Sequence, residues 1–382
     1  MLLLSASVGE GHVAAARALA VRMRRLWPDA QVREVEDTGR GHERRDRLLR
    51  SAYELTMRAA PALYGIGYDL LVRHPRIAEL CKRVTAVRLG RALAPLLAAE
   101  RPDLVVSTYP MISGGLAWLR RTGRLPARAV AVVTDVAVHP YWVWPELDET
   151  WTLLPSSRDQ ARALAPGADV RVAAAPVDAR LRPGDREQAR AVLGLRPDAL
   201  VVLVTGGSLG FGGLGRVTAA VLAAGEGVQA VVLCGHNDRL RTRLLARRLP
   251  AERLVVRGWT DRVAEHITAA DLVLTTAGGM IATESLAVGR PVLFAAPVPG
   301  HGRAGAEMTA AAGLALVCPT PADVTAAVRR LVADPGELAR LARAAAEFGA
   351  RDLDAELAEL GVRAARAVRA GGMPSNRAEG VS

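Results

Sequence analysis

Residues 272–297 read LVLTTAGGMIATESLAVGRPVLFAAP, and no other part of the sequence says more about the fold. The apolar run Leu272–Leu274 predicts a buried parallel strand. Gly278 and Gly279 follow, and because they lack a Cβ they permit a tight turn. Met280–Val288 then predicts a short helix, which Gly289 ends. A strand, a glycine turn and a helix in this order are typical of a parallel α/β sheet.

The first amides of that helix would face the carboxyl edge of the sheet. Unpaired N–H groups and the positive end of the helix dipole favour an anion there, such as a diphosphate. Glu284 follows one turn later and could accept two hydrogen bonds from a ribose diol. The same pattern also fits a plain strand-to-helix connection with Glu284 in solvent. Other motifs of the chain are needed to choose between this connection and an anion site.

Apolar runs alternate with helical patterns along the whole chain, which predicts the α/β class. At 382 residues we expect two doubly wound domains, residues 1–176 and 189–370, the second including the C-terminal helices. Residues 177–188 would be the linker and 371–382 a disordered tail. A ligand cleft is expected between the facing carboxyl edges. The predicted strands are Leu2–Ser5, Gln31–Val35, Leu104–Ser107, Ala129–Thr134, Glu149–Leu153, Val170–Ala174, Leu200–Thr205, Gln229–Cys234, Leu254–Arg257, Leu272–Thr275, Pro291–Ala295 and Leu314–Val317.

A second glycine-rich loop, TGGSLGFGG at 205–213, follows the first strand of the second domain. Its glycines let the backbone wrap around phosphate oxygens, and Ser208 adds a donor. Two such loops at carboxyl ends of strands in one domain favour a phosphate site over a plain connection.

The first domain opens with SASVGEGHVAAARAL at 5–19. Gly9, Gly11 and Ala14 fit a dinucleotide fingerprint, and an acid at Glu34–Asp37 would suit a ribose, so an NAD-linked enzyme is one alternative. Against it, His12 would project from the helix start into the cleft, where a pyrophosphate needs the space. The helix dipole would help to keep that imidazole neutral, as a general base requires. A structural histidine bonded to backbone is the other interpretation.

The stretch VVTDVAVHPYW at 132–142 supplies further polar groups at the same edge. Asp135 ends a buried strand, and its carboxylate could be a general base, an orienter of His12 or a cap for the next segment. His139 and Trp142 follow in one loop, where they could simply pack on each other.

Charge and composition limit the class of partner. The net charge is +11, and residues 40–91 hold 12 basic against 5 acidic side chains, interleaved with tyrosines and aliphatic residues. That segment would suit an anionic lipid surface, or else a solvated helical excursion. No apolar run reaches membrane-span length, and the three cysteines lack metal-site spacing. Nothing in the sequence calls for a metal.

These motifs together resemble the monogalactosyldiacylglycerol synthase and processive diacylglycerol glucosyltransferase group of glycosyltransferase family 28. RPDLVVSTYP at 101–110, RGWTDRVAEHITAADLVLTTAGGMIATESLAVGRPVLF at 257–294 and PVPG at 297–300 extend the likeness over most of the chain. It implies a GT-B architecture, a UDP-sugar held by the second domain, a lipid acceptor met by the first, and no cofactor. It also implies a cytoplasmic enzyme that associates peripherally with the inner face of the cell membrane and has no nucleic-acid partner.

The resemblance assigns roles residue by residue. His12 and Asp135 fall on the positions that activate the acceptor hydroxyl, with Gly11, His139 and Trp142 on the acceptor side. The donor-side residues are Gly207 and Ser208 with Gly278, Gly279, Met280 and Ile281 at the diphosphate, Glu284 at the ribose, Trp259 and Thr260 at the uracil, and His301.

One segment departs from the family pattern. Relatives typically continue after PVPG with Gln-Glu and a nearby Asn that contact the sugar or position its loop, whereas this chain has HGRAG at 301–305. We predict an inverting, metal-independent hexosyltransferase acting on diacylglycerol or a glycosyl-diacylglycerol. The alternatives are a transferase for a soluble aglycone, a nucleotide-sugar epimerase, and a UDP-binding module with a degraded sugar site.

Overall fold

The computed structural model describes residues 1–6, 10–36, 74–208, 210, 212–247, 249–250, 252–277 and 279–371. Most of the basic segment 40–91, all but the first residue of the predicted tail 371–382, and Gly9 and Gly278 lie outside the described residues. Gly371 ends a helix.

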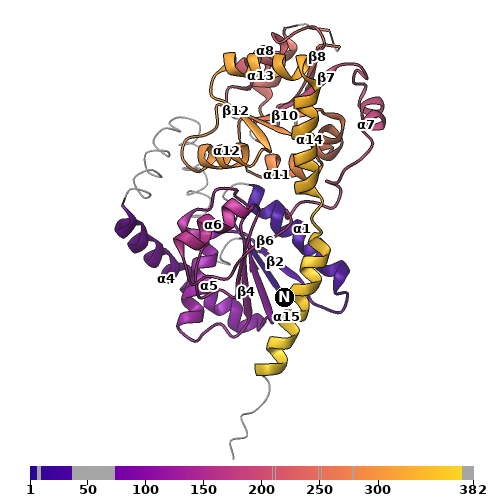
Figure 1. Ribbon diagram of the computed structural model, residues 1–382. Coiled ribbons are helices and arrows are strands. Elements are labelled where there is room, and N and C mark those ends of the chain that lie inside the picture. Colours follow the sequence, from indigo (N-terminus) through magenta and orange to yellow (C-terminus); the bar gives the residue numbers. More distant parts are fainter. Residues whose placement is uncertain are drawn as a thin grey trace, which may run out of the picture.

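Two six-stranded parallel sheets organise the chain, one in each half (Figure 1). The first has the order β2-β1-β3-β4-β5-β6 and the second β12-β11-β10-β7-β8-β9. The strands are β1 Leu2–Ser5, β2 Arg33–Glu36, β3 Leu104–Ser107, β4 Arg128–Val132, β5 Glu149–Thr152, β6 Val170–Val172, β7 Leu200–Thr205, β8 Val228–Leu233, β9 Leu254–Arg257, β10 Leu272–Thr275, β11 Val292–Ala295 and β12 Ala315–Cys318.

Helices connect these strands and cover the sheets. In the first half they are α1 Glu10–Leu26, α4 Pro75–Glu100, α5 Pro110–Arg121, the 3₁₀ turn η1 Pro140–Trp142 and α6 Pro155–Leu164. The later ones are α7 Arg186–Leu193, α8 Leu214–Leu222, α9 Asp238–Leu245, α10 Val263–Ala269, α11 Met280–Ala287, α12 His301–Ala311, α13 Pro321–Ala333, α14 Pro335–Gly349 and α15 Leu353–Gly371.

The predicted α/β class and all twelve predicted strands are confirmed, with ends that shift by at most two residues. Buried apolar runs explain this agreement, because the central strands are covered on both faces by helices. β7, for example, is buried at five of its six residues.

Strand order places the ligand edge of each sheet. In the first sheet the chain reverses direction across the sheet between β1 and β3, and in the second between β7 and β10. Ligands of doubly wound sheets bind outside the carboxyl ends at such switch points. The turns after β1, β7 and β10 are the glycine-containing turns that the sequence singles out.

The last helix corrects the expected domain assignment. We expected the C-terminal helices to complete the second domain, and α14 does pack there, since a Cβ on Gly349 would lie 2.4 Å from the Ala287 carbonyl oxygen of α11. α15 crosses back to the first half (Figure 1). Its Leu357 and Leu360 join Leu19 and Met23 of α1 in one buried cluster. Amphipathic periodicity shows that a helix has an apolar face, but not which sheet covers it.

The predicted linker is also shorter than 177–188. Residues 186–188 form the first turn of α7, which begins because the Asp185 side chain accepts a hydrogen bond from the Gln188 amide at 2.9 Å. The charged sequence of this turn resembles a loop, but an aspartate at this position is a good N-cap.

Candidate functional site

The carboxyl edges of the two sheets meet where α1 and α11 begin. A Cβ on Gly11 would lie 2.7 Å from Met280 Cγ, so the two helix starts touch across the interface. Gly11, expected on the acceptor side, and Met280, expected on the donor side, are therefore neighbours. The positive ends of two helix dipoles converge at this place, which favours an anion between them.

His12 lies in the first turn of α1 and is partly buried. Its Nδ1 is 3.0 Å from the hydroxyl oxygen of Thr134, and its carbonyl accepts a hydrogen bond of 2.8 Å from the Thr108 hydroxyl. The ring of Tyr109 packs edge-on against the imidazole with centroids 5.2 Å apart. Burial lowers the pKa of His12; Asp135 and the Thr108 backbone oppose that shift and His301 adds to it. A neutral imidazole, as a general base needs, is therefore favoured at pH 7.

Asp135 follows β4 and is bound to the loop that it begins. Its Oδ2 accepts a hydrogen bond from Trp142 Nε1 at 3.1 Å, and Trp142 is completely buried. The carboxylate is close enough to His12 to act on its pKa. The hydrogen bond to Trp142 holds the 135–142 loop together, and the predicted role of Asp135 as a general base stays a prediction.

Two further histidines complete this edge. His139 precedes η1, where its Nδ1 accepts a hydrogen bond from the Tyr141 amide at 3.3 Å. Burial is the main reason why the pKa of His139 falls to about 4. His301 is the first residue of α12 in the second half, and it contributes to the lowered pKa of both His12 and His139. His301 therefore lies near the acceptor-side histidines, and its predicted contact with the donor stays a prediction.

The glycine turns of the second half are built as an anion site requires. Gly279 caps α11 with φ of +62°, and among the residues that the structure describes no side chain caps the first amides of that helix. Met280 and Ile281 form its first turn, and Gly207 has φ of +71° in the neighbouring loop. The carbonyl of Ser208 accepts a hydrogen bond of 2.8 Å from the His236 amide, which holds this loop against the next one.

A cavity of about 310 Å³ lies between α1, the linker and α11. Ala14 and Ala18 of α1, linker residues 176–181, Val263, Met280 and Glu284 line it. Burial, and to a lesser extent the nearby Asp178 carboxylate, raises the pKa of Glu284 to about 7. The size of the cavity, and the Glu284 carboxylate beside the α11 start, suit a nucleoside whose diphosphate reaches the amides of α11.

Trp259, which we expected at the uracil, does not line this cavity. It is 60% exposed and stacks on His236 with ring centroids 5.8 Å apart. Thr260 does not line the cavity either, and its hydroxyl accepts a hydrogen bond of 3.1 Å from the Arg262 amide. The neighbouring Asp261, Val263 and Ala264 form that wall instead.

Sequence reasoning missed several residues of the site. Thr134 and Thr108, which contact His12, follow neighbouring strands β4 and β3. Their position directly after buried strands was the available signal, because such residues meet at one edge. Nothing in the sequence indicated that Asp178 of the linker would act on Glu284.

Metal sites and membrane spans can be judged only for the described residues. No group of three or more His, Cys, Asp or Glu side chains suited to a metal ion occurs in that part of the chain. None of its helices is both long and apolar enough to cross a bilayer.

Each half of the chain matches a family model. Residues 12–169 match monogalactosyldiacylglycerol (MGDG) synthase, and residues 201–357 match the glycosyltransferase family 28 C-terminal domain. The processive diacylglycerol beta-glucosyltransferase of Bacillus subtilis (strain 168) is 26% identical over 359 residues, which is 89% of each chain. The protein of that name from Bacillus licheniformis is 27% identical over 252 residues, 65% of each chain.

Solved structures show the same fold at low identity. MurG from Acinetobacter baumannii has a TM-score of 0.59 at 17% identity, with 95% of this chain and 99% of that chain covered. SsfS6 from Streptomyces sp. SF2575, complexed with thymidine diphosphate, has a TM-score of 0.60 at 17% identity, with the same coverage. HepE from Anabaena, in complex with UDP, has a TM-score of 0.56 at 15% identity and covers 96% of this chain and 99% of its own. The predicted GT-B architecture is thereby confirmed.

Proposed function

Because the chain is a glycosyltransferase of family 28 related to diacylglycerol glucosyltransferases, we propose that it transfers a hexose from a UDP-sugar to a lipid hydroxyl, with inversion at the anomeric carbon. The observation that carries this proposal is the contact between the α1 and α11 starts, which sets His12 beside a helix end suited to a diphosphate. The glycosyltransferase models on both halves leave no support for the NAD-linked enzyme or the epimerase.

His12 is the proposed base. Its imidazole takes the proton of the acceptor hydroxyl while the hydroxyl oxygen attacks the anomeric carbon. The bond between that carbon and the diphosphate oxygen breaks, and UDP leaves with the electron pair. The lowered pKa of His12 supports this role, since its main cause, burial, disfavours the protonated form. Replacing it with alanine should lower the rate roughly 100-fold or more.

The leaving UDP gains negative charge on its diphosphate. We propose that the first amides of α11 and the Gly207–Ser208 turn accept this charge, since fixed N–H dipoles need no reorganisation during the reaction. The ribose would lie at Glu284 in the cavity. A nucleoside diphosphate is a reasonable ligand for this fold, since HepE was solved with UDP and SsfS6 with thymidine diphosphate.

The lipid surface would meet α4. Ile77, Leu80 and Val84 lie on one side of this helix and are 50%, 63% and 60% exposed. Arg83, Arg88 and Arg91 surround an adjoining hollow that includes Val84. Apolar side chains among arginines suit an anionic bilayer surface. The family match and the relatives' named substrate support a diacylglycerol acceptor there.

The inner side of α4 connects this surface with the proposed acceptor loop. Lys82, the only lysine of the chain, is buried and donates a hydrogen bond of 3.0 Å to the Val143 carbonyl. Its ammonium lies 4.1 Å from the Trp144 ring centroid. Both partners follow directly after η1, so lipid bound at α4 would be close to His139 and Asp135.

A donor and acceptor screen tests the reaction. UDP-glucose, UDP-galactose and UDP-N-acetylglucosamine would each be offered with diacylglycerol in vesicles and with a soluble glycoside. We expect UDP release that depends on the lipid acceptor and that His12→Ala nearly abolishes. Transfer to the soluble glycoside alone would favour the runner-up, a transferase for a soluble aglycone, and UDP binding without any transfer would contradict the proposal.

Vesicle sedimentation tests the membrane surface with a matched pair of variants. Val84→Asp and Val192→Asp change equally exposed valines, at 60% on α4 and 61% on α7. Burial of one valine contributes roughly 1.5 to 3 kcal/mol, so Val84→Asp should weaken binding to anionic vesicles about tenfold or more. Val192→Asp should bind like the unmodified protein. Equal loss in both variants, or equal binding to neutral vesicles, would contradict the α4 surface.

A further inference from the structure

The proposed base is held by two buried threonines from neighbouring strands. Thr108 follows β3 and Thr134 follows β4, and these strands pair in parallel. The Thr108 hydroxyl bonds the carbonyl of His12 at 2.8 Å and the Thr134 hydroxyl contacts Nδ1 of the imidazole at 3.0 Å. One threonine thus fixes the backbone of His12 and the other its ring.

The contacts of His12 differ from those of a Ser-His-Asp triad, in which a carboxylate orients the histidine ring. Asp135 is adjacent in sequence to Thr134, but its Oδ2 accepts the indole hydrogen bond of Trp142. Its effect on His12 is that of a nearby charge. The group in hydrogen-bond contact with the ring is a neutral hydroxyl.

A hydroxyl at Nδ1 has a specific consequence for the other ring nitrogen. In a neutral histidine the hydrogen bond at one nitrogen decides which nitrogen carries the proton. When Thr134 accepts a hydrogen bond from Nδ1–H, Nε2 keeps its lone pair and can take a proton. Nε2 has no hydrogen bond to any side chain or backbone group within the described residues. The aromatic rings of Tyr109 and Trp142 confine the imidazole sideways, with centroids at 5.2 and 6.0 Å.

From this geometry we propose that Thr134 is the positioning residue of the reaction: its hydroxyl accepts the Nδ1–H of His12, selects the tautomer with a free Nε2 and aims that nitrogen at the acceptor hydroxyl. The proposal rests on the proposed function of His12 as base. After proton transfer the imidazolium keeps the same hydrogen bond, because Nδ1–H is present in both states. The threonine oxygen thus serves the reaction without changing its own protonation.

Thr134→Val and Thr134→Ser form the matched pair that tests this role. Valine has nearly the shape of threonine without the hydroxyl, and serine keeps the hydroxyl. For Thr134→Val we expect kcat to fall roughly 10- to 100-fold, the scale of a misaligned reacting group, with an unchanged KM for the UDP-sugar. Thr134→Ser should retain most of the rate. Equal kcat in the valine variant and the unmodified enzyme, or a serine variant as slow as the valine variant, would overturn the proposal.

The tautomer can be measured without turnover. NMR spectra of protein labelled with ¹⁵N-histidine contain signals from seven histidines. The signals of His12 are those that disappear in His12→Gln. We expect the Nδ1–H tautomer in the unmodified protein and in Thr134→Ser, and its loss in Thr134→Val. An Nε2–H tautomer in the unmodified protein would overturn the proposal even if no variant folds.

The pH profile adds a readout that a purely structural role would not change. Among the described residues, the titratable groups that face His12 from neighbouring elements are Asp135, His301 and Tyr109, and neither variant alters them. Loss of the acceptor at Nδ1 should move the acidic limb of kcat to lower pH and lower the plateau. If His12→Gln keeps full turnover, the proposed base is wrong; if His12→Gln is inactive while Thr134→Val matches the unmodified enzyme in rate and tautomer, only the role of Thr134 is wrong.

Discussion

Glu284 carries the clearest electrostatic signature of the second half. Burial in the cavity, with Asp178 nearby, raises the pKa of Glu284 to about 7. The ionised carboxylate accepts hydrogen bonds at both oxygens, and these charge-assisted bonds to the ribose hydroxyls are stronger than those of the protonated acid. Affinity for UDP should therefore rise between pH 6 and pH 8 by up to roughly tenfold, because one pH unit below the pKa leaves a tenth of the carboxylate ionised. Calorimetric titration at the two pH values measures this change.

Glu284→Gln and a modified ligand separate this effect from the titration of UDP itself. The amide keeps the size of the side chain but does not ionise, so the variant should bind UDP more weakly at pH 8 and lose the pH dependence that Glu284 causes. A hydrogen bond to a charged group contributes about 1.5 to 3 kcal/mol, which corresponds to roughly 10-fold or more in affinity. 2′,3′-Dideoxy-UDP has the same phosphates without the diol. If its affinity rises with pH as much as that of UDP, Glu284 does not bind the ribose.

At the scale of secondary-structure elements, the starts of α1 and α11 determine the site. Gly11 allows the approach, since a Cβ would meet Met280 Cγ at 2.7 Å and Cβ at 3.3 Å. Gly11→Ala should therefore push the two helix starts apart and separate His12 from the proposed diphosphate site. A misplacement on the order of 1 Å costs roughly 100-fold in rate. Steady-state kinetics with the UDP-sugar and acceptor identified by the screen would measure this loss.

Two controls accompany Gly11→Ala. Gly227→Ala adds the same methyl group where no atom lies within 4 Å, so its activity should stay unchanged. Met280→Ala removes the atom that clashes, so the double variant Gly11→Ala, Met280→Ala should regain part of the lost rate. Full activity of Gly11→Ala alone would show that the contact between α1 and α11 does not matter for the reaction.

The secondary-structure elements could be predicted from the sequence, but several contacts between their loops could not. Strands β1 to β12 follow from buried apolar runs, which are local signals, and the glycine turns follow from backbone conformations that other residues rarely adopt. The partner of His12 could not be predicted, because Thr134 lies 122 residues away and Asp135 next to it was the chemically stronger candidate. Trp259 turns toward His236 for a similar reason: the sequence places it at the edge, but packing between β8 and β9 loops decides its direction. Local patterns thus fix elements, whereas contacts between loops fix roles.

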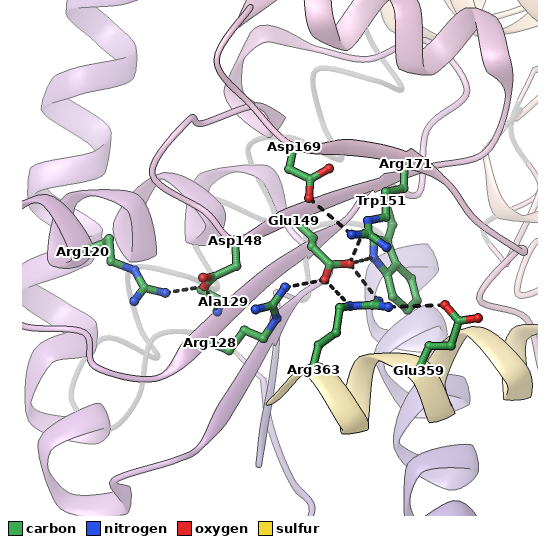
Figure 2. A network of polar contacts seen from close by, with 10 residues as sticks. All are labelled: Arg120, Arg128, Ala129, Asp148, Glu149, Trp151, Asp169, Arg171, Glu359 and Arg363. Atoms are coloured by element: carbon green, nitrogen blue, oxygen red, sulfur yellow. Dashed lines mark hydrogen bonds and ion pairs between the residues drawn. The ribbon is translucent and has the colours of Figure 1, made fainter. Parts of the chain in front are cut away.

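For the whole molecule, a buried charge holds α15, which follows the second half in the chain, on the first half. Figure 2 shows Glu149 of β5 among arginines from three elements. Its fully buried carboxylate contacts Arg128 at 2.6 Å, Arg363 of α15 at 2.7 Å and Arg171 at 3.4 Å. Burial alone would raise the pKa of Glu149, but hydrogen bonds from Trp151, Arg128 and Arg363, with the charge of Arg171, lower it overall. The ionised carboxylate therefore attaches α15 to the first sheet.

Loss of this charge should release α15. Breaking a buried ion pair typically costs about 3 to 5 kcal/mol, so Glu149→Gln should lower the melting temperature and speed hydrogen exchange in residues 353–366. Glu359→Gln removes a carboxylate that is 72% exposed and contacts the same Arg363 at 3.3 Å. Exposed pairs contribute little, so this variant should behave like the unmodified protein.

The pH dependence of α15 docking follows from the direction of the Glu149 shift. Because the pKa is lower in the folded than in the unfolded protein, the stabilisation is fully present above the unfolded value of 4.5 and is lost as pH falls through the folded value. Hydrogen exchange in α15, corrected for the intrinsic effect of pH, should therefore accelerate below about pH 4.5, and Glu149→Gln should lack this transition. If the two proteins lose α15 protection in parallel as pH falls, the helix is held by its apolar contacts with α1 and not by Glu149. If only the unmodified protein shows the transition, one buried carboxylate keeps the last helix of the chain on the half that holds the proposed base.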